Sequence, residues 1–148
     1  MTPLATIVRE PIDPAEMLRR VAAPANGAVI LFLGAVRQVN DGRAVTGIDY
    51  AAYEQMALSE LASIATEASE RFGTSDVAVE HRLGTLAVEE LSVAIAVGHA
   101  HRDAAYEASR WMIEELKRRV PIWKREHYAD GTREWVDPSG RPAQELVP

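Results

Sequence analysis

The apolar residues of this sequence switch repeatedly between helical spacing and strand spacing, and this order limits the possible folds more than any other feature. Residues 53–72 and 103–119 carry apolar side chains on one stripe at helical spacing. Residues 76–83 and 91–99 instead place their larger apolar side chains at every second position, as strands do. A chain that interleaves the two periods in this way is expected to form an α+β domain.

Shorter signals predict the remaining elements. Asp13 directly precedes Pro14, an arrangement typical of a helix start, and the helix should turn Met17, Leu18 and Val21 inward. An uninterrupted apolar run predicts a buried strand over residues 28–34, and a polar segment predicts a turn or mobile loop over residues 37–43. Further strands are expected over residues 4–9, 45–53, 122–128 and 133–136, the last two as a hairpin around Asp130-Gly131. The predicted order β-α-β-β-α-β-β-α-β-β has hairpin-length links and indicates a mixed, mainly antiparallel sheet.

Composition places the chain among globular proteins. Apolar residues make up 47% of the 148 residues and charged residues 26%, which excludes a disordered class. We expect one domain over residues 1–137 and a loose, proline-rich tail over residues 138–148. We expect no membrane span, because the longest apolar run is far too short to cross a bilayer. The absence of cysteine excludes disulfides, thiolate metal ligands and a cysteine nucleophile, and suits the cytoplasm.

The charge distribution is uneven. The net charge of −6 argues against general nucleic-acid binding. Yet five cations lie within nine residues, which we call the basic segment: Lys117, Arg118, Arg119, Lys124 and Arg125. Cations at a helix C-terminus complement the helix dipole, but this does not explain Lys124 and Arg125, which follow Pro121. A basic segment on an acidic protein predicts an anionic ligand or an acidic partner segment, and a lysine among other cations can act as a nucleophile or proton carrier.

Three other positions could carry chemistry. Arg37 follows Gly34 at the end of an apolar strand and could grip a phosphate with its planar guanidinium, or could be an ordinary exposed arginine. Strand alternation turns His81 toward the apolar face, which favours a packing role over catalysis. His101 and Arg102 lie where a strand gives way to a helix that Asp103 could cap, and the first N–H groups of a helix favour an anion.

The pair His99 and His101 also invites a metal interpretation, since His-x-His can chelate. We favour the anion site and expect no metal, because no third ligand stands at a diagnostic spacing and Arg102 would repel a dication. His99 continues the apolar face of its strand, so a packing role is expected for it.

Taken together, these segments resemble the molybdopterin synthase large (catalytic) subunit family. The matching stretches are Gly34-Ala35-Val36-Arg37, His81-Arg82-Leu83-Gly84-Thr85-Leu86, Ala100-His101-Arg102 and Leu116-Lys117-Arg118-Arg119-Val120-Pro121-Ile122-Trp123-Lys124-Arg125-Glu126. The last is the most specific, because a Pro-Trp break between two lysines has no generic structural reason. The resemblance implies an α/β hammerhead-type domain with a small additional β-subdomain, and a homodimer.

The same resemblance implies the reaction and the partner. A small ubiquitin-like sulfur-carrier subunit, ending in Gly-Gly as a thiocarboxylate, would bind at each end of the homodimer. Sulfur would pass from it to cyclic pyranopterin monophosphate, and two transfers would make the molybdopterin dithiolene. The chain would thus be a sulfurtransferase without a cofactor of its own, which fits the absence of cysteine because the sulfur arrives on the partner.

The family's site residues carry over by position. Lys117 resembles the central catalytic lysine and Lys124 the second essential lysine of the same pocket. Arg37, His101 and Arg102 resemble residues that hold the pterin and its phosphate, some of them across the dimer. Arg133 resembles an arginine that closes the pocket from the neighbouring subunit. The alternatives are a non-enzymatic module that binds an acidic peptide tail of a partner, and a histidine-based metal hydrolase.

Overall fold

The computed structural model describes residues 3–136, and the helices and strands follow the predicted order with two short strands added. The elements are β1 (Leu4–Val8), α1 (Pro14–Val21), β2 (Ala28–Ala35), β3 (Val39–Asn40), β4 (Arg43–Ala52), α2 (Glu54–Phe72), β5 (Val77–Arg82), β6 (Gly84–Ala87), β7 (Leu91–His99), α3 (Arg102–Arg119), β8 (Ile122–Tyr128) and β9 (Arg133–Val136). The tail predicted for residues 138–148 lies outside the described residues. No helix of residues 3–136 is long and apolar enough to cross a membrane.

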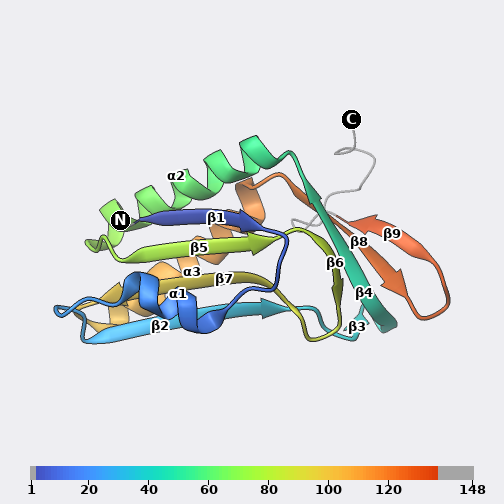
Figure 1. The fold of residues 1–148 in the computed structure, drawn as a ribbon, viewed down its shortest axis with the longest axis horizontal. Helices are drawn as coiled ribbons and strands as arrows, with labels where there is room; N and C mark the ends of the chain where they lie inside the picture. The colour runs from blue at the N-terminus through green and yellow to red at the C-terminus, as the bar shows by residue number, and fades with distance from the viewer. Residues whose placement is uncertain (1–2, 137–148) are drawn as a thin grey trace.

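The first sheet has the strand order β1-β5-β7-β2 and is covered by helices on both faces (Figure 1). Only β1 and β5 are parallel; the other pairs are antiparallel. Val77, Val79 and Val93 pack against α2 and α3, whereas Ala78 and Ala94 pack against α1. Because helices cover both faces, the central strand β7 is apolar at nearly every position and not only at alternate ones.

Local signals in the sequence set the start of α1 and the end of α2 as predicted. The Asp13 side chain accepts a hydrogen bond from the Ala15 N–H at 3.0 Å, and α1 follows. Gly73 adopts the left-handed conformation (φ 68°) that closes α2.

The expectation that Leu18 of α1 faces inward is wrong, because Leu18 is 41% exposed. The short α1 presents only Met17 and Val21, one helical turn apart, to the sheet.

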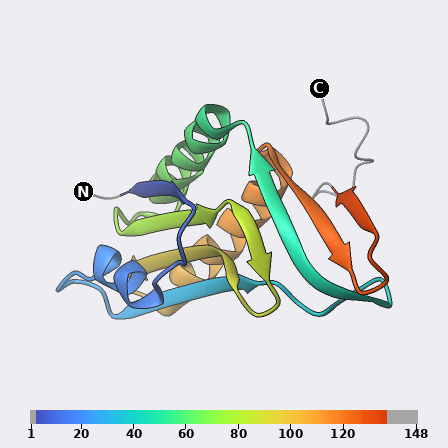
Figure 2. The ribbon, with the colours of Figure 1, turned by 45° about the vertical axis from the view of Figure 1, so that its right-hand side comes forward.

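The second sheet lies at one end of the first, with β4 and β8 side by side along its length (Figure 2). Its order is β3-β4-β8-β9, and β6 also pairs with β4. This sheet is the expected additional β-subdomain, and the predicted α+β class with a mixed, mainly antiparallel sheet is confirmed.

The turn predicted within residues 37–43 is confirmed as a tight hairpin turn between β3 and β4, in which Asp41 (φ 50°) and Gly42 (φ 76°) supply the two positive φ angles. The burial predicted for the strand over residues 28–34 is wrong. The strand predicted as buried over residues 28–34 is β2, an edge strand, so Val29 and Leu33 are 43% and 37% exposed.

Candidate active site

A cavity of about 180 Å³ opens where the second sheet meets the ends of β2 and β7 and the last turns of α3. Its lining combines apolar and charged side chains: Phe32, Gly34, Ala35, Arg37, Asn40, Val45, Ile48, Tyr50, Ser92, Val93, Ile113, Lys117, Lys124 and Glu126. Concave sites with a few convergent polar groups are where proteins bind small molecules. This cavity is therefore the first candidate for an active site.

Three of the residues predicted from sequence meet in this cavity. Arg37 comes from the loop after β2, Lys117 from α3 and Lys124 from β8. Neither the Arg37 nor the Lys117 side chain forms a hydrogen bond or ion pair with another residue of the described range 3–136. Two cations without an internal partner on one cavity wall are available to bind anions that enter it.

Lys124 is held by a carboxylate that sequence reasoning missed. Lys124 Nζ lies 3.2 Å from Glu126 Oε1, and Glu126 is only 1% exposed. Glu126 Oε2 also accepts hydrogen bonds from Asn40 Nδ2 and from the Tyr128 hydroxyl, both at 2.7 Å. Burial acts to raise the pKa of Glu126, but hydrogen bonds from Tyr128, Asn40 and Lys124 outweigh it and lower that pKa. The carboxylate therefore stays ionised and fixes the position of the Lys124 ammonium group.

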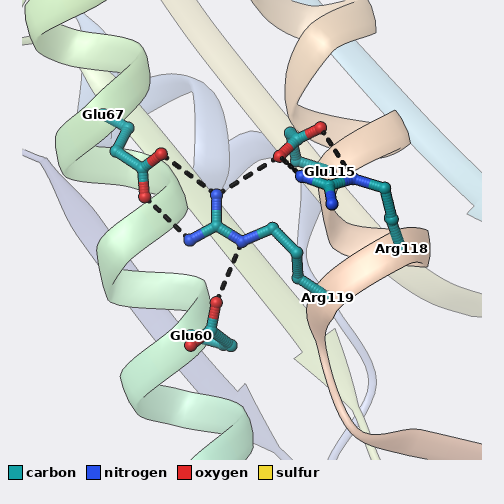
Figure 3. A network of polar contacts seen from close by, with 5 residues as sticks. All are labelled: Glu60, Glu67, Glu115, Arg118 and Arg119. Atoms are coloured by element: carbon teal, nitrogen blue, oxygen red, sulfur yellow. Dashed lines mark hydrogen bonds and ion pairs between the residues drawn. The ribbon is translucent and has the colours of Figure 1, made fainter.

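The rest of the basic segment does not face the cavity. Arg119 reaches across to α2, where its guanidinium contacts Glu60 at 2.9 Å and Glu67 at 2.7 Å, and it also bonds Glu115 of its own helix (Figure 3). Arg118 pairs with Glu115 alone. Arg119 therefore holds α2 and α3 together, whereas Arg118 is paired within α3, and these structural roles distinguish both arginines from Lys117.

Arg125 points to the opposite face of the second sheet from Lys124, as strand alternation requires. Its guanidinium bonds Asp49 Oδ2 at 2.7 and 2.9 Å, and His127 Nε2 and Thr85 Oγ1 reach the same carboxyl group at 2.8 Å each. Burial opposes ionisation of Asp49, but the hydrogen bonds from His127, Arg125 and Thr85 prevail and lower its pKa to about 2. This ionic cluster ties β4, β6 and β8 together on the face away from the cavity.

His101 and Arg102 lie far from the cavity within one chain. His101 is the N-cap of α3 and Arg102 its first residue, and both are exposed. With a rise of about 1.5 Å per residue, Arg102 lies about 23 Å from Lys117 along α3. The helix begins one residue earlier than predicted, so Asp103 lies in its first turn instead of at the cap.

The His99 ring is already engaged by the backbone. Its Nε2 contacts the Phe72 carbonyl oxygen at 2.8 Å, and its Nδ1 accepts the His101 N–H at 2.9 Å. Within residues 3–136 no three His, Asp or Glu side chains are grouped so that they could hold a metal ion. His99 therefore serves to join the end of β7 to the end of α2, as its packing role implied.

Arg133 is also remote from the cavity of its own chain. It lies opposite His127 in the β8–β9 pair, whereas Lys124 lies opposite Val136. Opposed residues in antiparallel strands share a face, so Arg133 projects on the Asp49 side of the sheet, away from Lys124. The structure thus brings together Arg37, Lys117 and Lys124, but not His101, Arg102 or Arg133.

A second, smaller cavity of about 90 Å³ adjoins the first, because Tyr50, Lys117 and Lys124 line both. His81 forms part of its wall, together with the apolar side chains of Leu116, Val120 and Ile122.

The sequence held a usable signal for the missed residues of the site. Alternation along β8 places Lys124, Glu126 and Tyr128 on one face, which marks an inward-facing polar row.

The arrangement suits reactions in which negative charge develops or is transferred. Lys117 and Lys124 place two ammonium groups at one cavity, which Arg37 and several apolar side chains also line. Cations held in a partly dry cavity stabilise an oxyanion or thiolate more strongly than cations in water do. The site can therefore receive two anionic groups and assist a transfer between them.

Comparison with known proteins shows the family of this chain. The family model described as "MoaE protein" matches residues 7–119. The molybdopterin synthase catalytic subunit of Aspergillus clavatus is 40% identical over 137 residues, which cover 93% of this chain and 69% of that protein. The corresponding subunit of Thermoplasma volcanium is 41% identical, over 87% of this chain and 94% of that protein. The crystal structure of molybdopterin synthase from Staphylococcus aureus superimposes with a TM-score of 0.83 at 36% identity, covering 87% of this chain and 93% of that one. The chain therefore belongs to the MoaE family.

Proposed function

We propose that this chain is the catalytic subunit of a molybdopterin synthase. It transfers sulfur from the C-terminal thiocarboxylate of a small carrier protein to cyclic pyranopterin monophosphate, forming the dithiolene of molybdopterin. Family membership and the names of its relatives support this assignment. The main structural support for the assignment is that Lys117, Lys124 and Arg37 line one cavity of this chain.

The residues of the cavity have distinct roles in this proposal. Arg37 binds the substrate phosphate through its planar guanidinium. Lys117 and Lys124 flank the carrier's terminal carbonyl and stabilise the negative charge that forms there as sulfur leaves. Glu126 holds Lys124 in place through the 3.2 Å ion pair. No residue of this chain needs to carry sulfur, which agrees with the absence of cysteine.

We further propose that the active form is a homodimer in the cytoplasm that binds one carrier per chain. His101, Arg102 and Arg133 are exposed residues remote from the cavity of their own chain. A second copy related by twofold symmetry could bring such residues to that cavity, since each surface of a symmetric dimer meets its equivalent. In this arrangement they complete the binding site for the pterin phosphate.

Reconstitution with a thiocarboxylated carrier and the cyclic pterin tests the proposal. The purified chain should form a stable complex with the carrier and convert the pterin to the dithiolene product, detected by mass spectrometry. Binding of the carrier without product would support instead a non-enzymatic module for an acidic peptide tail. Failure to bind either the carrier or the pterin would reject the proposed function.

A further inference from the structure

His81 is a buried histidine whose second nitrogen opens into the lysine cavity. It lies on β5, is 5% exposed, and its Nδ1 lies 2.9 Å from the Arg82 carbonyl oxygen. A carbonyl oxygen only accepts hydrogen bonds, so Nδ1 carries the proton and Nε2 carries a lone pair. Burial lowers the pKa of His81 to about 4, although the bond to Arg82 acts to raise it, so the ring is neutral near pH 7.

The environment of Nε2 shows where this lone pair points. Nε2 forms no hydrogen bond with residues 3–136. Within that range, every side-chain nitrogen or oxygen that is fully enclosed by protein does have a hydrogen-bond partner, so Nε2 is not fully enclosed. Nε2 must therefore contact open space, and the space beside His81 is the 90 Å³ cavity. Tyr50 fixes the ring in an edge-on contact, with the ring centres 5.2 Å apart.

Only a few water molecules fit into a cavity of this size. Its other polar side chains are Tyr50, Lys117 and Lys124. The Lys124 ammonium is engaged by Glu126, whereas Lys117 has no partner among the described residues. Of the two ammonium groups on this wall, Lys117 is thus the one that no partner residue among the described residues holds in place, and His81 Nε2 is a ring nitrogen that has no donor among them.

We infer that His81 is a positioning residue that accepts a hydrogen bond from the Lys117 amine, directly or through one water molecule, and so holds that amine inside the cavity. Without this acceptor the Lys117 side chain, which belongs to an exposed residue, is free to turn toward solvent. A buried packing role alone would not require a lone pair on the cavity wall. The contact itself does not depend on the proposed function; its effect on turnover does.

Nitrogen NMR of the imidazole tests the contact without any activity assay. The wild-type protein should show His81 as the neutral form protonated at Nδ1. The Nε2 resonance should move in Lys117→Ala and move much less in Lys124→Ala, because Lys124 is already bound to Glu126. Protonation at Nε2 instead, or an Nε2 resonance that is the same in wild type and Lys117→Ala, would overturn the inference.

Turnover in the reconstituted system tests the consequence. His81→Phe fills the ring volume but cannot accept a hydrogen bond, so kcat should fall about tenfold while KM for the pterin and the affinity for the carrier change little. His81→Gln restores an acceptor oxygen and should recover most of kcat. Equal kcat for His81→Phe and wild type, or equal loss in both variants, would refute the positioning role.

Glu80→Gln is the matched control. Glu80 is the preceding residue of β5, is also 5% exposed, and faces the other side of the sheet, where it bonds Thr6 and Arg20. This variant should lose stability while keeping the kcat of wild type, whereas His81→Phe should lose kcat. If the wild-type chain shows no turnover at all, the proposed function fails and the NMR result alone decides the role of His81.

Discussion

Glu126 is a buried carboxylate among cavity residues that are otherwise neutral or cationic. Its three hydrogen-bonding partners, Asn40, Lys124 and Tyr128, come from β3 and β8 and leave it almost no contact with solvent. A group so enclosed costs much to desolvate, and only its partners offset that cost. The loss of its charge should therefore affect both the stability of the fold and the position of Lys124.

Glu126→Gln should lower the free energy of unfolding by about 1–3 kcal/mol, because the amide cannot satisfy three donors as the carboxylate does. Turnover should also fall, since Lys124 loses the anion that holds it. Urea denaturation and product formation measure the two effects. Glu134→Gln, which changes the exposed residue opposite Glu126 in β9, is the control and should alter neither by much. Equal stability of wild type and Glu126→Gln would contradict this account of the buried carboxylate.

Arg37 differs from Glu126 because its side chain makes no hydrogen bond or ion pair within residues 3–136. Arg37→Ala should therefore change the unfolding free energy by less than about 0.5 kcal/mol, as exposed substitutions usually do. Substrate affinity should fall at least tenfold, because a charge-assisted bond to phosphate contributes about 1.5–3 kcal/mol. Calorimetric titration with the pterin phosphate measures this difference, and equal affinities would exclude Arg37 from the phosphate site.

At the scale of elements, the Asp49 cluster joins three strands of the second sheet and should govern their response to acid. Its pKa of about 2 lies below the ordinary value of an unfolded aspartate, near 3.9. A lowered pKa means that the folded state favours the ionised form, so this stabilisation is complete above about pH 4 and declines as the pH falls toward 2.

Asp49→Asn should remove that part of the acid dependence. The variant should be less stable by about 1–3 kcal/mol at neutral pH, and the difference from wild type should shrink between about pH 4 and pH 2. Denaturation curves at a series of pH values provide the measurement. Glu107→Gln, an exposed change on α3 whose side chain makes no hydrogen bond or ion pair within residues 3–136, serves as the control. A gap between wild type and Asp49→Asn that stays constant down to pH 2 would contradict the ionic account.

Elements with strong local signals could be predicted from sequence, and elements fixed by tertiary contacts could not. The stripe on α2, its glycine cap and Pro121 after α3 are local, and they set the helix bounds to within a residue. The strands β3 and β6 have two and four residues and form only because β4 pairs with them. The edge position of β2 depends on strand order, which apolar spacing does not encode.

The candidate site was predicted in part for the same reason. Motif order identified Arg37, Lys117 and Lys124, which meet at the cavity. The basic segment looked uniform in sequence, but helix and strand geometry sends Arg119 to α2 and Arg125 to Asp49. Whether a cation has a structural role or is free to bind a ligand depends on ion pairs with elements that lie far away in the sequence. No local sequence pattern contains that information.

At the scale of the whole molecule, the two ends of α3 lie too far apart to contribute to the same site within one chain. If Lys117 and Arg102 serve one active site, a second chain must supply one of them. Lys117 and Arg102 lie about 23 Å apart along the helix. In a symmetric dimer, Lys117 of one chain and Arg102 of its partner would form each site. Two variants that are each inactive should then restore activity when their chains are mixed.

Lys117→Ala and Arg102→Ala should complement each other. After chain exchange, half of the dimers are mixed and one of the two sites in each is intact, so about one quarter of wild-type turnover should return. Turnover before and after chain exchange gives the measurement. A mixture of Lys117→Ala with Lys124→Ala is the control. Because both lysines line the same cavity of one chain, this mixture should recover no activity. No recovery with Arg102→Ala would place each site within a single chain.

The account as a whole rests on Lys117 assisting sulfur transfer in the cavity between the two sheets. The most direct test compares single-turnover dithiolene formation by wild type, Lys117→Ala and the neighbouring control Arg118→Ala, each with thiocarboxylated carrier. Lys117→Ala should slow product formation at least about a hundredfold, the scale of losing one preorganised charge at a reacting centre, with fold and carrier affinity intact. Arg118→Ala, which loses only its bond to Glu115, should react at nearly the wild-type rate. A Lys117→Ala rate close to that of wild type would contradict the central claim.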